Sequence, residues 1–391
     1  MITKLEFTNF RSFAGTTVID FTLGRKPTPT GYDVVLGEQR CNKVIAIVGA
    51  NGAGKTQILK VFAFLQWFIV ESFPRKEPEG VLPNEAHALC GDMESQFSLN
   101  FVIDGIEYRY DLVIADGGVV SESLHKKTSS RFSYIFKREK SDSGFTFEQK
   151  GFPFEKRDLT ANASILAMAK SYNLKEAEPF IDYFLGMFTN VVSGGRIQFQ
   201  HSDVFEAAKL YSSLPDLKLR LVEAIKEFDL GISDINIVKR ERIDDSGNSG
   251  DVYLPWGVHI VDDGTKFELP FIEESSGTQS AFAILRYILP VLQSGGIAVI
   301  DELDNDLHPH LIPRLLEWFE FEHTNPHQAQ LIFTSHTPEV LNVLQKHQVY
   351  LVEKSNQRSE AWRLDEVIGL RADDNLYAKY MAGALGATPE L

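Results

Sequence analysis

The residues Gly49-Ala50-Asn51-Gly52-Ala53-Gly54-Lys55-Thr56 match the pattern G-x-x-x-x-G-K-[ST] and stand between two apolar runs, residues 44–48 and 58–70. This pattern between a strand and a helix is typical of a P-loop. Its glycines let backbone N–H groups point at phosphate oxygens, Lys55 bridges the terminal phosphates, and the Thr56 hydroxyl can bind Mg²⁺. The motif therefore predicts that the chain binds ATP or GTP. The predicted nucleotide contacts are Asn51, Gly52, Ala53, Gly54, Lys55 and Thr56.

A second apolar run, residues 297–300, ends in Asp301-Glu302. A short run of this kind is typical of a parallel strand that is buried on both faces. Because open α/β sheets bind ligands at the carboxyl ends of their strands, we interpret it as a Walker B strand. Asp301 would then hold Mg²⁺, and Glu302 would polarise the attacking water. Taken alone, the pattern also fits a core strand that ends in solvated acids, and the P-loop favours the nucleotide site.

Three further elements follow the order found in ABC-type ATPases. Ser276-Gly277 precedes an apolar helix and resembles the signature motif, which in that superfamily contacts the γ-phosphate bound to the other subunit's P-loop. Asp304 lies in a segment that resembles the D-loop, and His336 follows the apolar residues 331–333, like the switch histidine that senses γ-phosphate. A serine N-cap or a single histidine is often only structural. Their order is what favours a functional interpretation.

The two ends of the chain resemble narrower groups within this superfamily. Residues 2–13, with the letters NFRSF, look like the first hairpin of RecF, SMC and OLD-type ATPases, in which the basic residue, here Arg11, lies near the nucleotide. Without the resemblance, Arg11 is equally well explained as a solvated turn residue. Residues 371–389 are similar to the tail of compact RloA-like ABC ATPases from bacterial abortive-infection and anti-phage systems. The resemblance implies an ATP-binding, Mg²⁺-dependent ATPase, and it does not extend to residues 130–250.

We therefore expect an α/β fold, an ABC ATPase head with a P-loop core sheet, an antiparallel β lobe and a helical insertion. Residues 1–125 would form lobe I, in which Asp104-Gly105 predicts a hairpin between alternating strands. Residues 126–250 would form a variable, largely helical insertion that ends in an exposed loop at 244–250. Residues 251–391 would form lobe II, with the signature, Walker B, D-loop and switch elements.

Composition favours a cytoplasmic location. The 391 residues include only two cysteines, Cys41 and Cys90, which we expect to be free thiols in a reducing compartment. The chain opens without a signal peptide, and its longest apolar tract, residues 58–70, falls short of the ~20 residues that span a bilayer, so we expect no membrane partner. The net charge of −15 does not favour a protein dominated by phosphate-backbone binding. Basic clusters remain open as solvated strand faces or as a DNA or partner surface: Lys126-Lys127, Arg131 with Lys137-Arg138, and Lys239-Arg240 with Arg242.

Several assignments stay open. A Q-loop glutamine is expected, and no context decides among four candidates, Gln96, Gln149, Gln198 and Gln200. His308 and His310 are interpreted as interface or structural residues in preference to metal ligands. The preference for ATP over GTP comes from the resemblance alone.

The absence of sustained heptads argues against a long-armed SMC protein, and the few residues after His336 leave no room for an OLD-type nuclease. We expect an ATP-hydrolysing homodimer or higher homo-oligomer, joined through composite ATP sites, that controls a separate toxin or nuclease in anti-phage defence. One alternative is a RecF-like repair ATPase that acts on DNA. Another is an ATP-binding scaffold that sequesters a toxin without appreciable turnover.

Overall fold

The computed structural model describes residues 1–24, 27–37, 39–73, 82, 85–155, 159–228, 230–243, 249–308, 310–371 and 373–388. A six-stranded sheet lies at the centre, in the order β12-β18-β19-β6-β20-β21, and all neighbouring pairs except β20 and β21 are parallel. Its strands are β6 (Val44–Val48), β12 (Met187–Thr189), β18 (Ile297–Ile300), β19 (Gln330–Ser335), β20 (Val349–Ser355) and β21 (Arg358–Arg363). The predicted P-loop and Walker B strands are thus both present, separated in the sheet by β19.

Alternate residues of the central strands face two different cores. Ile45 and Ile47 of β6 pack with helix α1 (Lys55–Glu71), together with the antiparallel sheet described below. Val44, Ala46 and Val48 face the other core, which contains the helices that follow residue 200. This explains the unbroken apolar run at residues 44–48, because a strand covered on both faces needs apolar side chains in both directions. The second core is formed mainly by α4 (His201–Ser213), α5 (Pro215–Glu227), α6 (Ser276–Ser294) and α8 (Leu311–Glu320).

An antiparallel sheet covers α1 from the other side. Its strand order is β11-β10-β9-β8-β7-β1-β2. The hairpin predicted at Asp104-Gly105 is confirmed, with positive φ angles of 49° and 75° at the two turn residues. The sheet continues through Gln149, past the division expected at residue 125, so the beginning of the middle segment is strand rather than helix. The strands are β1 (Ile2–Thr8), β2 (Thr17–Asp20), β7 (Ser95–Ile103), β8 (Ile106–Ala115), β9 (Gly118–Lys127), β10 (Phe132–Ser141) and β11 (Gly144–Gln149).

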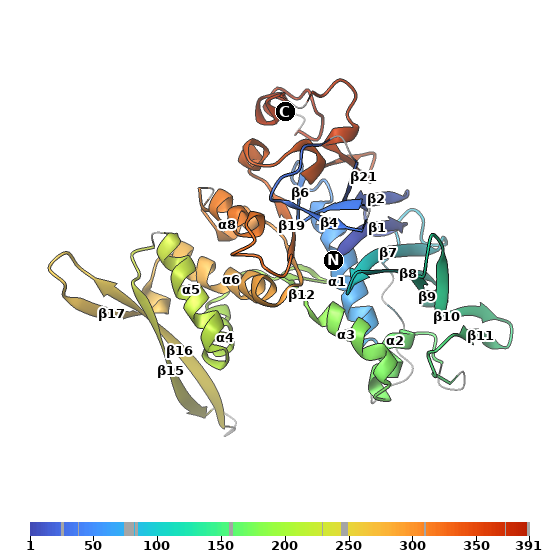
Figure 1. The fold of residues 1–391 in the computed structure, drawn as a ribbon, viewed down its shortest axis with the longest axis horizontal. Helices are drawn as coiled ribbons and strands as arrows, with labels where there is room; N and C mark the ends of the chain where they lie inside the picture. The colour runs from blue at the N-terminus through green and yellow to red at the C-terminus, as the bar shows by residue number, and fades with distance from the viewer. Residues whose placement is uncertain are drawn as a thin grey trace.

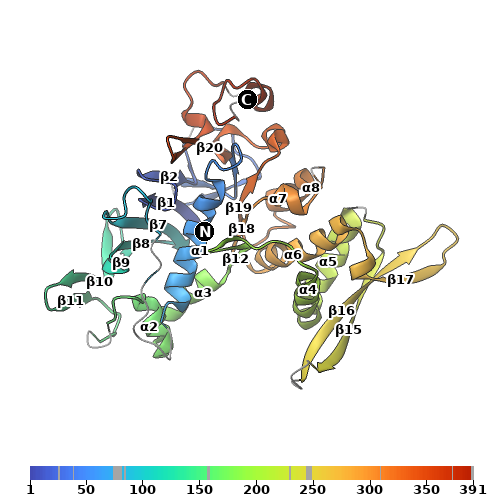
Figure 2. The same cartoon turned by 180° about the vertical axis from the view of Figure 1, so that it is seen from behind.

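Helices lie between residues 160 and 228 of the insertion that was expected to be largely helical, although three short strands interrupt them. They are α2 (Ile165–Ser171), α3 (Glu178–Leu185), α4 and α5, and between α3 and α4 lie β12, β13 (Val191–Val192) and β14 (Gly195–Arg196). Both figures show α2 and α3 beside α1, while α4 and α5 lie with α6 on the far side of the central sheet (Figures 1 and 2).

A long β-arm extends from the α4–α6 side of the molecule, at the end opposite to β10 and β11 (Figures 1 and 2). It consists of β15 (Asp234–Ile243), β16 (Ser249–Ile260) and β17 (Lys266–Pro270). The expectation of an exposed loop at 249–250 is wrong, because Ser249 and Gly250 begin β16 and pair with the end of β15. Residues 244–248 of the expected loop lie outside the described residues. The division at residue 250 therefore falls within a hairpin, and the domain boundaries stay a prediction.

The remaining elements close the ends of the central sheet. A small sheet of β3 (Thr22–Leu23), β4 (Asp33–Leu36) and β5 (Gln39–Asn42) precedes β6, and 3-10 helices η2 to η6 connect larger elements. The tail carries α9 (Leu376–Met381) and returns to the P-loop, where the Ala50 N–H donates to the Ala387 carbonyl at 3.1 Å. No helix in the described ranges is long and apolar enough to cross a membrane. Cys41 and Cys90 are free thiols, as expected.

One member of the basic clusters, Arg138, belongs to the core, whereas Arg131 of the same cluster is exposed. The side chains of Arg138 and Glu122 are both fully buried, with Nη2 of Arg138 2.6 Å from Oε2 of Glu122. Arg138 also donates to the carbonyls of Thr160 and Ala163, and Glu122 accepts from the Tyr110 and Ser164 hydroxyls. These bonds compensate for most of the buried charge, although Nε of Arg138 has no hydrogen-bond partner among the described residues. The pair joins the antiparallel sheet to the start of α2, where the Ile165 N–H donates to Glu122.

A second buried polar residue is His347, at the end of the segment that follows β19. Its side chain lies close to two ion pairs, Arg40 with Asp33 and Arg363 with Asp365. Within the described part of the chain, neither ring nitrogen has a hydrogen-bond partner. Burial lowers the pKa of His347 to about 4, with the charges of the nearby ion pairs acting in both directions. The ring is therefore neutral at pH 7.

Because His347 has a lower pKa in the folded chain than in the unfolded chain, acid should weaken the fold through this residue. The unfolded state takes up the proton first, below about pH 6.5, and stability falls until the folded-state value near 4 is reached. We predict that, from pH 7.5 to pH 5, the free energy of unfolding falls by about 2 kcal/mol less in His347→Phe than in the parent. Urea unfolding at the two pH values measures this difference. Equal losses in the two proteins would show that His347 is not buried as a neutral ring.

Candidate nucleotide site

The P-loop joins β6 to α1 in a conformation that only its glycines allow. Gly54 caps α1 with φ 118°, and a Cβ at this position would lie 2.5 Å from the Ser359 hydroxyl oxygen. No side chain caps α1, so the N–H groups of its first turn remain for a ligand. Asn51 and Gly52 are exposed, whereas Ala53 is buried and its carbonyl accepts from the Ser359 hydroxyl at 2.6 Å. Ser359 thus supports the loop on one side, and the side with Asn51 and Gly52 is exposed.

Lys55 points back along this loop. Its Nζ donates to the carbonyls of Gly49 and Ala50 at 2.8 and 3.1 Å, and it lies 3.1 Å from Nδ1 of His336. Burial lowers the pKa of Lys55, and the carboxylates at the end of β18 act in the opposite direction. The structure therefore brings together the P-loop lysine and the predicted switch histidine, which are far apart in the sequence.

Asp301 lies at the carboxyl end of β18 and is almost fully buried. Its carboxylate accepts from the Thr56 hydroxyl at 2.8 Å and from the Thr334 hydroxyl at 2.6 Å. Asn190, which follows β12, holds the backbone on both sides, donating to the Asp301 carbonyl and accepting from its N–H. Burial raises the pKa of Asp301, and the two hydroxyl donors oppose that rise. Thr56 and Asp301, the two predicted metal ligands, are thus adjacent.

Glu302 has a left-handed backbone, with φ 52°, and its N–H donates to the Thr334 hydroxyl at 2.7 Å. Its carboxylate contacts Nε2 of His336 at 3.1 Å, Nη1 of Arg196 at 3.1 Å and Nδ2 of Asn305 at 2.7 Å. Burial alone would raise the pKa of Glu302. The hydrogen bond to His336 and the charge of Arg196 outweigh burial and lower it. Glu302 is therefore held as a carboxylate next to the P-loop.

Asp304 forms hydrogen bonds with the segment that contains the predicted switch histidine. Its carboxylate accepts from the His336 N–H at 3.0 Å and from the Thr337 hydroxyl at 2.5 Å. These bonds tie the residues after β18 to those after β19. A nucleotide contact by Asp304 stays a prediction.

The predicted signature residues lie elsewhere on the surface. Ser276 and Gly277 are exposed at the start of α6, whose N-cap is Ser275, with its hydroxyl accepting from the Thr278 N–H at 3.2 Å. Within the described residues, no hydrogen bond or ion pair joins Ser276 or Gly277 to the P-loop of the same chain. The start of this helix is thus accessible to another molecule.

Arg11 extends past the P-loop to the β13–β14 turn. It forms an ion pair with Glu85, and Nη2 donates to the Ser193 carbonyl at 3.1 Å. Its neighbour Ser12 is the residue that reaches the P-loop region, with its hydroxyl 2.8 Å from that of Ser359. A nucleotide contact by Arg11 stays a prediction.

Sequence reasoning missed the residues that support this site from other segments. Arg196, Asn190 and Ser359 carry no motif, whereas Ser12 and Thr334 lie in segments that had been singled out, residues 2–13 and the run before His336. Among the open glutamines, Gln96 and Gln149 lie on the antiparallel sheet and Gln200 caps α4, while Gln198 follows the strand that carries Arg196. His308 and His310 stack edge to face with centroids 5.1 Å apart, and the described residues contain no group of three or more His, Cys, Asp or Glu side chains that could hold a metal ion.

Comparison with known proteins identifies the family. The model of the family described as "AAA domain, putative AbiEii toxin, Type IV TA system" matches residues 44–342. The chain belongs to this family. A search of curated proteins found no match.

Solved structures that are similar to this chain include SMC heads. An SMC head bound to the C-winged helix domain of ScpA superposes with a TM-score of 0.51 at 13% identity, covering 94% of this chain and 99% of that chain. The SMC head domain from Thermotoga maritima gives a TM-score of 0.43 at 16% identity, covering 94% and 99%. An Smc head with an extended coiled coil, bound to the C-terminal domain of ScpA derived from Pyrococcus furiosus, gives 0.45 at 12%, covering 93% and 97%. The first match confirms the predicted fold of an ABC-type head, and the family model identifies an AAA domain.

Arg196 provides a direct test of the geometry around Glu302. We predict that Arg196→Ala raises the pKa of Glu302 and moves the acid limb of the ATPase pH profile to higher pH, since a nearby positive charge is lost. Arg196→Lys keeps the charge and should keep the parental limb. Initial rates between pH 5 and pH 9 measure the shift. An identical acid limb in all three proteins would show that Arg196 does not control this carboxylate.

Proposed function

We propose that this chain is an ATP-hydrolysing, nucleotide-driven dimeric switch that controls a partner toxin or nuclease in bacterial anti-phage defence. The observation that carries the proposal is the meeting of Lys55, Thr56, Asp301, Glu302 and His336 at the carboxyl edge of one parallel sheet. Membership of an AAA family and the fold of an ABC-type head support ATP as the nucleotide.

The residues present fit a Mg²⁺ ion. The Thr56 hydroxyl and the buried Asp301 carboxylate lie 2.8 Å apart, and oxygen donors of these two kinds are those that Mg²⁺ prefers. When bound, the ion would supply charge that offsets the charge of the phosphates. Lys55 and the N–H groups at the start of α1 would hold the phosphate oxygens, with Asn51, Gly52, Ala53 and Gly54 forming the loop around them.

Glu302 is the candidate general base. Its pKa lies below the ordinary value, so at neutral pH it can accept a proton from a water that attacks the terminal phosphate. His336 contacts both Glu302 and Lys55, which suits a residue that responds to the terminal phosphate. Because the chain contains both Glu302 and His336 in contact, the arrangement favours turnover over a scaffold that only binds ATP.

Dimer formation follows from the position of the signature residues. Ser276 and Gly277 are exposed and separate from their own P-loop, so they would complete the site of a second copy. The N-terminus of α6 would then direct its N–H groups at the bound phosphate. On this proposal ATP closes the dimer and hydrolysis reopens it.

Control of a partner protein is favoured over direct action on DNA. Lys127, Lys137 and Lys239 form ion pairs with Glu107, Glu148 and Asp251, and the net charge is −15. The family description names a toxin and a Type IV TA system, and one similar SMC head was solved with ScpA bound. Free Cys41 and Cys90 suit the cytoplasm, where thiols stay reduced.

Glu302→Gln tests the catalytic assignment. We predict that this variant binds ATP like the parent but turns over about 10² to 10⁴ times more slowly, because the amide cannot accept the proton. Initial rates and calorimetric ATP titration measure the two properties. Glu273→Gln, an exposed change close to the signature residues, is the control and should keep full activity. Hydrolysis by Glu302→Gln at the parental rate would remove Glu302 from the mechanism.

Mixing two inactive variants tests the composite site. Ser276→Arg and Lys55→Ala should each be inactive as homodimers and should regain part of the activity when mixed, since one site then pairs an intact P-loop with an intact signature. Lys55→Ala mixed with Glu302→Gln is the control without recovery, because both changes affect the P-loop side of a site. ATPase activity is measured against mixing ratio after subunit exchange is confirmed. Full activity in the Ser276→Arg homodimer would contradict the shared site.

A further inference from the structure

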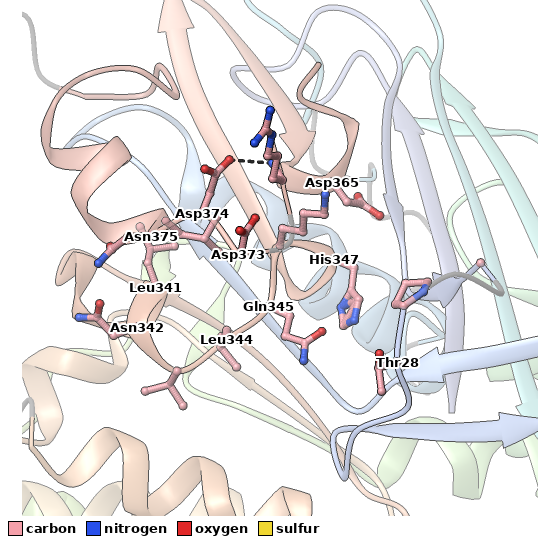
Figure 3. A pocket seen from close by; sticks show the side chains of 16 residues that line it. Thr28, Leu341, Asn342, Leu344, Gln345, His347, Asp365, Asp373, Asp374 and Asn375 are labelled. Atoms are coloured by element: carbon pink, nitrogen blue, oxygen red, sulfur yellow. Dashed lines mark hydrogen bonds between the residues drawn. The ribbon is translucent and has the colours of Figure 1, made fainter. Parts of the chain in front are cut away.

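A cleft of about 1160 Å³ lies away from the nucleotide site. One wall is the Pro27–Thr28 loop, the second is the segment after the switch, residues 341–347, and the third is the tail at residues 371 and 373–376 (Figure 3). Lys55, Asp301, Glu302 and His336 are not among the residues that line it. The cleft is therefore a separate feature of the fold.

Hydrogen bonds from side chains hold each wall in place. Arg40 donates to the Pro27 carbonyl at 2.6 Å, and Lys346 donates to the Leu370 carbonyl at 2.9 Å. In the tail, the Asp374 carboxylate accepts from the Arg371 N–H and from Lys379, both at 2.7 Å. The cleft is thus built by specific contacts between segments that are remote in the sequence.

His347 gives this cleft an unused hydrogen-bonding group. Its side chain lines the cleft, where Figure 3 draws it with Gln345 and Thr28, and the residue is 2% exposed. In the described structure both ring nitrogens lack partners. A buried imidazole without hydrogen-bond partners destabilises the fold unless a ligand or water forms a hydrogen bond with it. Since the ring is neutral, it offers one donor and one acceptor.

The charges around the cleft nearly cancel. Asp365 pairs with Arg363, and Asp374 pairs with Lys379. The two remaining charged side chains of the tail wall, Arg371 and Asp373, have opposite signs and are exposed. A phosphate-rich or polycationic ligand would meet no excess of opposite charge here. The cleft suits a ligand that is neutral or balanced in charge.

We propose that this cleft binds an extended peptide segment of a partner protein. An extended main chain alternates N–H donors with C=O acceptors, which matches the neutral imidazole of His347 and the amides of Asn342 and Asn375. Val343, which is half-buried, adds apolar surface for the peptide's side chains, and the buried Leu341, Leu344 and Leu376 lie beneath the cleft as part of the core. The volume is above the ~300–1,000 Å³ that is usual for small-molecule sites, which favours a peptide over a metabolite.

Peptide binding in the cleft would alter the nucleotide site, and this effect rests on the proposed function. The wall segment begins shortly after His336 and Thr337, which bond to Asp304. The tail that forms the opposite wall continues to Ala387, whose carbonyl accepts from the Ala50 N–H of the P-loop. A bound peptide therefore contacts two segments that each end at the ATP site.

The test uses a displayed library of random dodecapeptides, selected on the full-length protein without nucleotide. Thr28→Arg adds a bulky charge at the exposed rim, and Thr128→Arg makes the same change at an exposed turn outside the cleft. Peptides enriched on the parent should bind Thr128→Arg equally and Thr28→Arg at least about tenfold more weakly by fluorescence anisotropy. They should also change the ATPase rate of the parent and leave that of Thr28→Arg unaltered.

His347→Phe keeps the ring and removes both nitrogens, so it should also lose peptide binding while its thermal unfolding midpoint stays at or above that of the parent. A library that yields no peptide selective for the parent over Thr28→Arg overturns the proposal. So does a thermal shift produced by free nucleosides or amino acids in the absence of any such peptide. Because binding is measured without ATP, selective binding by a protein that lacks ATPase activity would contradict the proposed function and leave the peptide site standing.

Discussion

The structure depends on the buried carboxylate of Asp301. It accepts hydrogen bonds from Thr56 at the start of α1 and from Thr334 on β19, and it stands at the end of β18. Three elements that are far apart in the sequence therefore converge on one charged group. A buried charge is costly unless hydrogen bonds and opposite charge compensate for it. Both donors here are neutral hydroxyls, and burial still raises the pKa of Asp301, so the site is suited to receive a cation.

Thr334 links this carboxylate to Glu302. Its hydroxyl donates to Asp301 and accepts from the Glu302 N–H, which lets one side chain set the position of both acids. The left-handed backbone at Glu302 costs roughly 1–2 kcal/mol for a residue other than glycine. Hydrogen bonds to His336 and Asn305, together with the Arg196 contact, hold the side chain in the orientation that this backbone imposes. The strain is therefore located at the residue with the clearest chemical role.

Sequence patterns predicted the parts of the fold that depend on local chemistry. Residues 297–300 were recognised as a parallel strand that is buried on both faces, and residues 44–48 as the strand before the P-loop. Asp104-Gly105 predicted its hairpin because both residues tolerate positive φ. Arg138 was misinterpreted because alternation along a strand does not say which face another element covers, and α2 covers this one. Arg196 and Asn190 were missed because their partners at β18 lie more than a hundred residues away.

The β-arm was missed for a related physical reason. Only part of it is covered: Ile235 is fully buried, while the charged residues from Lys239 to Arg242 are exposed. The charged half weakens the alternation that would predict a strand, and pairing with β16 is what keeps it extended. An element of this kind is stabilised by its partner strand more than by its own burial.

The P-loop and the signature residues are connected to different neighbouring segments of the chain. The P-loop is held by Ser359 and, through the Ala387 carbonyl, by the tail. The signature residues are connected to the β-arm, because β17 leads through η3 (Phe271–Glu273) into α6, and His259 of β16 lies 2.7 Å from Glu274. If a second copy binds Ser276 and Gly277, it contacts the segment that leads to the β-arm. A bound phosphate contacts the P-loop, which is connected to the central sheet and the tail. Because α6 packs in the same core as Val44, Ala46 and Val48 of β6, both effects meet in that core, which would couple closing of the dimer to phosphate binding.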